Sequence, residues 1–296
     1  MKALSEIKNK FAKEKFSVGL DIGVVSAKTV KLRFFKEKFE LCDYKVEPVT
    51  SDLDEFLKKI SQQQEMKRVN IAVSGQSVIL RYINFPKMQQ AELKKALKFE
   101  AQKHIPFSLN DVSLDSYILK SDLPDNKMLV VLAAVKKDFL KQRVETFERA
   151  GLTVSMVDVD SLSLINAFEY NYSEEENLKN KTIALLNIGA MQSNLNILEG
   201  ILPRLSRDIA MAGSFFTQKI ADVLSLDFKA AENLKLNPDK ERLEKTSLAV
   251  EAALASLAGE IRVSFDYYES QSASSVSKMF LSGGGSKFSG LKDTLA

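Results

Sequence analysis

The chain of 296 residues has little of the residue types on which many catalytic and metal sites depend. It contains one cysteine, Cys42, and one histidine, His104. A disulfide within the chain is therefore excluded, and a zinc site built from cysteine and histidine is nearly so. Serine or cysteine hydrolase chemistry would have to use His104. That residue ends a helical apolar pattern, where packing or capping is the simpler interpretation.

The sequence also lacks a strong charge of one sign and long apolar runs. Its 42 Lys and Arg residues are balanced by 39 Asp and Glu residues, for a net charge of +3, which argues against a nucleic-acid partner. The longest apolar run, Met128 to Val135, is eight residues long, whereas a membrane helix needs about 20. No signal-peptide core precedes a small-residue cleavage site. These features predict a cytoplasmic, globular protein.

Residues 1–15 form a basic leader. Leu4, Ile7 and Phe11 follow one another at helical spacing among several lysines. Two interpretations stay open: a solvated leader that packs loosely on the first strand, or an amphipathic helix that lies on a membrane surface.

Apolar periodicity along the rest of the chain predicts two α/β lobes and a smaller α/β insert. The first lobe opens with three antiparallel strands, a helix and a strand, and three strands begin again after residue 181. Boundaries follow from polar segments and changes of period. The expected domains are a leader (1–15), a first lobe core (16–84 with 151–180), an insert (85–150), a second lobe core (181–213 with 255–296) and a helical subdomain (214–254).

A strand–turn–strand motif occurs twice in the chain. Each copy has a polar residue, an isoleucine and a glycine where a strand ends, followed by a serine: Asp21, Gly23 and Ser26 in the first copy, and Asn187, Gly189 and Ser193 in the second. Asp21 and Asn187 are 166 positions apart. A glycine at a strand end lets a ligand approach the backbone, and turn amides with a hydroxyl can hold phosphate. The repeat therefore predicts two related lobes.

Two further features extend this phosphate hypothesis. The carboxylate of Asp21 is suited to hold a hydrated magnesium ion near such phosphates. A third glycine turn, Gly283 to Gly285, follows the last predicted strand, where a flat ring could lie against the backbone. Each feature is common by itself, whereas their order along one chain is far more specific. Lys28 fails the spacing of a P-loop, so it either faces solvent or reaches the phosphates.

This order of motifs resembles the actin-like ATPase superfamily. Further segments narrow the resemblance to the PilM-like type IV pilus assembly proteins, ahead of the related FtsA and MshI proteins. These segments are Phe85–Met88, Leu97–Ala101, Ile105–Phe107, Leu205–Ile209 with Gly213, Glu260–Ile261, Tyr267–Ser270, Leu281–Gly285 and Gly290–Leu291. Together they cover about residues 16 to 292.

The resemblance implies an α/β, two-lobed actin-like fold, which is a duplicated ribonuclease H-like architecture with an FtsA-type insert. It also implies that ATP and magnesium bind between the lobes, with Asp21 holding the metal through water. The nucleotide-binding positions would be Asp21, Gly23, Ser26, Lys28, Asn187, Gly189, Ser193, Gly283, Gly284 and Gly285.

For partners, the resemblance implies a cytoplasmic scaffold at the inner membrane, as a homo-oligomer or a ring. It would bind the cytoplasmic N-terminal tail of a PilN-like membrane protein, and its own membrane contact would be indirect, aided by residues 1–15. A subset of the apolar insert residues would line the groove for this tail: Phe85, Pro86, Leu97, Phe99, Ile105 and Phe107.

Two departures from the family pattern carry expectations of their own. Asn187 stands where actin-like ATPases usually have aspartate, so we expect weak or no ATP turnover. The sequence reaches Ala296 where the family continues through another strand and helix, which predicts an unfinished second lobe. Two alternatives remain: an active ATPase or small-molecule kinase on the same fold, and an FtsA-like membrane-associated filament protein.

Overall fold

The computed structural model describes residues 15–36, 38–64, 66–237, 243–288 and 290–295. The leader therefore lies outside the described residues, except for Lys15. The chain divides into two compact units. The first contains the residues up to 78 with 107–113 and 135–160, and the second contains 79–106, 114–134 and the residues from 161 onward.

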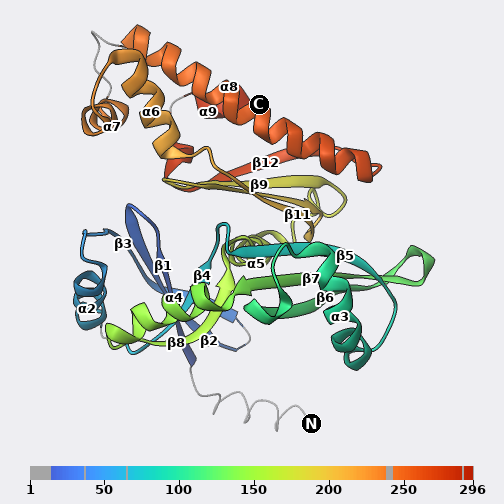
Figure 1. The fold of residues 1–296 in the computed structure, drawn as a ribbon. Coiled ribbons are helices and arrows are strands. Elements are labelled where there is room, and N and C mark those ends of the chain that lie inside the picture. Colours follow the sequence, from blue (N-terminus) through green and yellow to red (C-terminus); the bar gives the residue numbers. More distant parts are fainter. Residues whose placement is uncertain (1–14, 37, 65, 238–242, 289, 296) are drawn as a thin grey trace. The chain divides into compact units, whose positions relative to one another are not determined.

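The first unit is built on a five-stranded sheet of order β3-β2-β1-β4-β8 (Figure 1). The strands β1, β2 and β3 are antiparallel, and β4 runs parallel to β1 and β8. The predicted opening of three strands, a helix and a strand is confirmed. In chain order the elements are β1 (Lys15–Ile22), β2 (Ser26–Phe35), β3 (Lys38–Pro48), α2 (Leu53–Gln63), β4 (Arg68–Val73), α4 (Lys137–Arg149) and β8 (Thr153–Val159).

Every second residue of β1 is apolar and packs into the core of this unit. Val18, Leu20 and Ile22 pack with residues of α2 and α4, among them Leu57 and Phe147. Burying side chains of this size stabilises a fold by roughly 1.5–3 kcal/mol each, and strand period 2 sends all three residues of β1 to one face.

The opposite face of the first sheet carries exposed apolar side chains. The rings of Phe34 and Phe39, for example, pair across β2 and β3 with their centroids 4.9 Å apart, and both are more than one third exposed.

The second unit contains a three-stranded sheet of order β5-β7-β6 with one helix. Its elements are β5 (Val78–Pro86), α3 (Gln90–His104), β6 (Val112–Leu123) and β7 (Lys127–Lys136). The apolar run from Met128 to Val135 forms the central strand β7, in which nearly every residue is buried. Helix α3 buries Leu93, Leu97 and Ala101 along one side, as its period predicts.

The same unit contains a four-stranded sheet of order β11-β10-β9-β12, in which β12 is parallel to β9 (Figure 1). Its elements are α5 (Asp160–Tyr172), β9 (Thr182–Ile188), β10 (Ser193–Glu199), β11 (Leu202–Ile209), α6 (Gly213–Leu224), α7 (Phe228–Leu236), α8 (Leu243–Gln271), β12 (Val276–Ser282) and α9 (Leu291–Leu295). Alternate residues of β9 face two cores. Leu186 and Ile188 pack with α6, α8 and α9, whereas Ile183 and Leu185 pack with α5.

The sheets containing β1 and β9 repeat one plan. Each sheet contains three consecutive antiparallel strands. The first of these along the chain, β1 or β9, also pairs with a parallel strand, β4 or β12. Asp21 stands opposite Lys28 in the first ladder, and Asn187 stands opposite Asn194 in the second. The predicted duplication is confirmed. Among the described helices, none is long and apolar enough to cross a membrane.

Candidate functional site

The turn between β1 and β2 brings together the predicted residues of the first copy, which we call the first half-site: Asp21, Gly23, Ser26 and Lys28. The N–H of Gly23 donates to the carbonyl of Ser26 at 3.1 Å. Lys28 Nζ lies 2.9 Å from Asp21 Oδ2, and both side chains are about half exposed. Such an exposed pair contributes about 0–1 kcal/mol to stability, so it can exchange partners with a bound ligand at little cost.

A residue that sequence analysis missed, Arg143 of α4, contacts the same turn. Its Nη2 donates to the carbonyl of Ile22 at 3.2 Å, and the guanidinium lies over the ring of Phe147. Burial lowers the pKa of Arg143, and the carboxylates of Asp21 and Asp160 act in the opposite direction. An arginine stays cationic in proteins. Two cations therefore accompany Asp21, an arrangement that favours an anionic ligand.

The turn between β9 and β10 has the same backbone geometry with different chemistry. The N–H of Gly189 donates to the carbonyl of Gln192 at 3.0 Å. An amide pair replaces the ion pair, because Asn187 Nδ2 donates to Asn194 Oδ1 at 3.3 Å. Asn194 Nδ2 in turn donates to Asp208 Oδ1 at 2.7 Å. The second turn thus offers amide dipoles where the first offers charges.

The serines of the two copies are not structural counterparts. In the ladder Ser193 corresponds to Ala27, and Gln192 corresponds to Ser26. Ser193 is fully buried, and its hydroxyl donates to the carbonyl of Met211 at 2.6 Å, so it fastens the turn to the segment that precedes α6. By contrast, Gln192 Nε2 is a buried donor with no hydrogen-bond partner among the described residues.

The third glycine turn lies against the second hairpin. With Asn187 and Gly189, the residues Gly283 to Gly285 form what we call the second half-site. A Cβ on Gly283 would lie 2.3 Å from the carbonyl oxygen of Ile188, and one on Gly285 would lie 2.3 Å from Ile188 Cγ2. Ser282 Oγ also donates to Asn187 Oδ1 at 3.4 Å. Gly284 differs, since a Cβ there would meet no atom within 4 Å.

A buried lysine that the sequence analysis also missed connects to this half-site. The N–H of Gly213, at the start of α6, donates to the carbonyl of Gly189 at 3.0 Å. Lys235 Nζ donates to the carbonyl of Gly213 at 3.0 Å and to Thr217 Oγ1 at 2.8 Å, and it lies 2.7 Å from Glu232 Oε2. Its side chain is only 11% exposed. Lys235 thus ties α7 to the start of α6 beside Gly189.

Each turn by itself offers groups that suit part of a phosphate-bearing ligand with a flat ring. The first half-site supplies cations and a turn. In the second unit, Gln192 supplies an amide donor without a partner among the described residues, and Gly284 leaves open space. In the described part of the chain, no three His, Cys, Asp or Glu side chains gather to hold a metal ion directly.

The six residues predicted for the partner groove differ in their burial. Phe85, Leu97 and Ile105 are at most 6% exposed and belong to the core. Phe99 is 79% exposed, and Pro86 is also exposed. Phe107 is half-buried in the first unit, under the ammonium group of Lys136 at 4.5 Å from its ring centroid, whereas the other five belong to the second unit.

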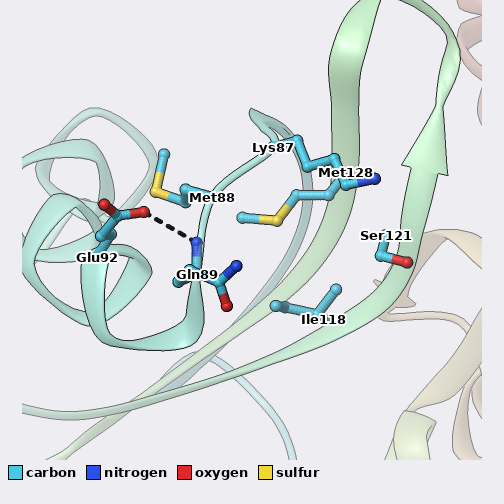
Figure 2. A pocket seen from close by; sticks show the side chains of 7 residues that line it. All are labelled: Lys87, Met88, Gln89, Glu92, Ile118, Ser121 and Met128. Atoms are coloured by element: carbon cyan, nitrogen blue, oxygen red, sulfur yellow. Dashed lines mark hydrogen bonds between the residues drawn. The ribbon is translucent and has the colours of Figure 1, made fainter.

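A small pocket lies where β5 leads into α3 (Figure 2). Its volume is about 490 Å³, and it is lined by Lys87, Met88, Gln89, Glu92, Ile118, Ser121 and Met128. The carboxylate of Glu92 accepts the N–H of Gln89 at 3.0 Å, so this group is occupied by capping α3. None of the six predicted groove residues lines the pocket.

Comparison with known proteins places these features in one family. A family model described as "Type IV pilus assembly protein PilM" matches residues 19–296. The solved structure of a "PilM-PilN type IV pilus biogenesis complex" is 27% identical, with a TM-score of 0.81 over 94% of this chain and 85% of that chain. The ethanolamine utilization protein EutJ from Carboxydothermus hydrogenoformans is 12% identical, with a TM-score of 0.52 over 95% of this chain and 80% of that one. The latter likeness concerns the fold alone. The fold of the chain is the two-lobed actin-like fold that the sequence predicts.

Proposed function

The chain belongs to the PilM family of type IV pilus assembly proteins, and on that premise we propose that it is a nucleotide-binding scaffold of a type IV pilus or a related secretion machine. One observation carries this proposal: the two equivalent glycine turns, of which the second is joined by the Gly283–Gly285 turn. The backbone amides and charges at these turns are of the kind that bind phosphate groups, which supports the proposal.

In this proposal the first half-site binds the phosphates. Lys28 and the turn at Gly23 and Ser26 contact them directly, and Arg143 acts as a positioning residue through the carbonyl of Ile22. The second half-site binds the adenosine ring over Gly284, where the open space supports it. Gln192 supplies a donor to the phosphates, and Ser193 acts by holding its turn to Met211.

We further propose that the bound nucleotide turns over slowly or not at all. Bound magnesium would neutralise phosphate charge, with Asp21 contacting it through water. Hydrolysis needs a positioned charge and water together. Asn187 contributes no charge, and its amide is engaged by Asn194 and Ser282. The nucleotide then acts as a structural ligand that tunes lobe closure.

The partner in this proposal is the cytoplasmic N-terminal tail of a PilN-like inner-membrane protein. The related solved complex pairs PilM with PilN, which supports a partner of this kind. Of the predicted groove residues, the exposed Phe99 and Pro86 and the half-buried Phe107 would contact the tail, and the buried members would support them. Binding this tail places the protein on the cytoplasmic side of the inner membrane.

Calorimetric titration of the full chain with magnesium–ATP tests the nucleotide site. We expect binding in the micromolar range or tighter. Gly284→Phe should weaken it at least about tenfold, because the new ring fills the space assigned to adenine.

Gly284→Ala is the matched control, since its methyl group meets no atom within 4 Å. We expect it to leave the affinity within about threefold of wild type. Equal affinities for the phenylalanine and alanine variants would contradict the assignment of the ring to Gly284. The absence of any binding by the wild-type chain would contradict the nucleotide proposal as a whole.

A further inference from the structure

A side-chain hydrogen bond joins two sheets of the second unit that come from distant parts of the chain. Tyr82 lies on β5, an edge strand of the three-stranded sheet, which we call the insert sheet. Ser206 lies on β11, an edge strand of the four-stranded sheet, which we call the second-lobe sheet. The Tyr82 hydroxyl and Ser206 Oγ are 2.9 Å apart. Because β5 and β11 belong to separate sheets, side chains rather than a backbone ladder make this contact.

The Tyr82 hydroxyl is the donor in this bond. Ser206 Oγ donates to Asn196 Oδ1 at 2.6 Å, and a serine hydroxyl has only one hydrogen to donate. Ser206 therefore accepts from Tyr82. Burial raises the pKa of Tyr82 to about 12, so the hydroxyl stays protonated and able to donate at neutral pH. The three side chains form a chain of hydrogen bonds that runs from β5 through β11 to β10.

This chain of hydrogen bonds ends at a buried amide that is only partly satisfied. Asn196 is fully buried on β10, the strand between β9 and β11. Its Nδ2 has no hydrogen-bond partner among the described residues. A buried polar network with an unsatisfied member stabilises a structure less than a complete one. The junction between the two sheets therefore has the character of a contact that opens and closes.

We propose that Tyr82, Ser206 and Asn196 form a latch that fastens the insert sheet to the second-lobe sheet, so that the insert sheet follows movements of the second lobe. The covalent connections of the insert sheet lead elsewhere. Strand β5 follows β4, and β7 precedes α4, and both β4 and α4 belong to the first unit. The backbone thus ties the insert sheet to the first unit, and the latch ties it to the second-lobe sheet.

The latch closes on a strand that also supports the second half-site. Asn194 and Asn196 are two positions apart on β10, so their side chains face the same side of the sheet. Asn194 accepts from Asn187 Nδ2 at 3.3 Å, and Asn187 belongs to the second half-site. A ligand that displaces Asn187 would alter the strand that holds the latch. This consequence rests on the proposed nucleotide site, whereas the latch itself does not.

Hydrogen–deuterium exchange of the full chain without ligand, followed by mass spectrometry of peptides that cover β5 and β11, tests the latch. Tyr82→Phe removes the donor and Ser206→Ala removes its acceptor, and neither change adds bulk. A buried hydrogen bond shifts a local opening equilibrium by about threefold to tenfold. We expect each variant to speed exchange in both strands by at least about threefold. The double variant should exchange no faster than Ser206→Ala alone, because that change already removes the bond to Tyr82.

A matched control separates the latch from a general effect of losing a tyrosine hydroxyl. Tyr117 lies on β6 of the insert sheet and is 69% exposed, so Tyr117→Phe should leave exchange in β5 and β11 unchanged. If Tyr82→Phe leaves exchange in β11 unchanged, whatever happens in β5, Tyr82 does not hold the two sheets together and the proposal is overturned. Additive effects of Tyr82→Phe and Ser206→Ala would overturn it as well. Because the experiment uses no nucleotide, its outcome is separate from that of the nucleotide titration.

Discussion

At the scale of single residues, Gly283 lets the turn that follows β12 approach the end of β9 closely. Its φ is +85° and its ψ is 167°, a region that is open essentially only to glycine. A Cβ there would also lie 2.3 Å from the carbonyl oxygen of Ile188. Gly283→Ala should therefore lower the free energy of unfolding by about 3 kcal/mol, measured by urea denaturation. Gly284→Ala is the matched control and should change it by less than about 0.5 kcal/mol; equal losses would refute this account.

Residues of this kind were predictable from the sequence where they belong to a local motif. Asp21, Gly189 and Gly283 belong to short motifs, and the structure places Gly283 against Ile188 and Asn187. Arg143 and Lys235 belong to no such motif. Arg143 reaches the carbonyl of Ile22 across 121 positions of the chain, and Lys235 reaches Gly213 from another helix. Contacts of this kind depend on tertiary packing, which a local pattern does not encode.

At the scale of elements, the two hairpins differ in charge rather than in backbone geometry. Asp21 with Lys28 forms an ion pair, and Asn187 with Asn194 forms an amide pair at the equivalent positions. We expect the wild-type chain to hydrolyse ATP more slowly than about one per minute, far below typical enzymes. Asn187→Asp should raise this rate at least about tenfold, because it restores a charge beside the phosphates.

A phosphate-release assay measures this effect, and Asn171→Asp, an exposed change of the same charge on α5, is the control. A wild-type rate near one per second would favour the ATPase alternative over the scaffold.

Helices and strands in which the apolar residues recur at a regular spacing were predictable from the sequence. Those in which polar residues interrupt that spacing were not. The long helix α8 follows from apolar residues three and four positions apart. The strand β5 was missed because Arg81 and Asn84 interrupt its apolar alternation and Pro86 suggests a break. The register of strand pairing in the two hairpins was also not predictable from the sequence. The sequence suggests that Ser26 and Ser193 are equivalent positions of the two repeats. In the structure, Gln192 occupies the position equivalent to Ser26.

At the scale of the whole molecule, the two half-sites belong to different units of the chain. A nucleotide that binds both would link the two units energetically. The residues proposed to contact the tail are distributed in the same way, because Phe107 belongs to the first unit and Phe99 to the second. Two ligands that each depend on the arrangement of the same two units can influence one another, and linkage requires any such influence to be equal in both directions.

We therefore predict that magnesium–ATP and a synthetic peptide copying a PilN-type N-terminal tail change each other's affinity by the same factor. Couplings of this kind usually amount to about 5–150-fold. Calorimetric titration of the peptide, with and without saturating nucleotide, measures the factor, and the reverse titration checks its symmetry. Gly284→Phe serves as the control: it should leave the affinity for the peptide alone intact and shift the effect of nucleotide to at least about tenfold higher ATP concentrations. If saturating ATP leaves the peptide affinity of the wild-type chain unchanged, the two sites are independent and the nucleotide does not tune the scaffold.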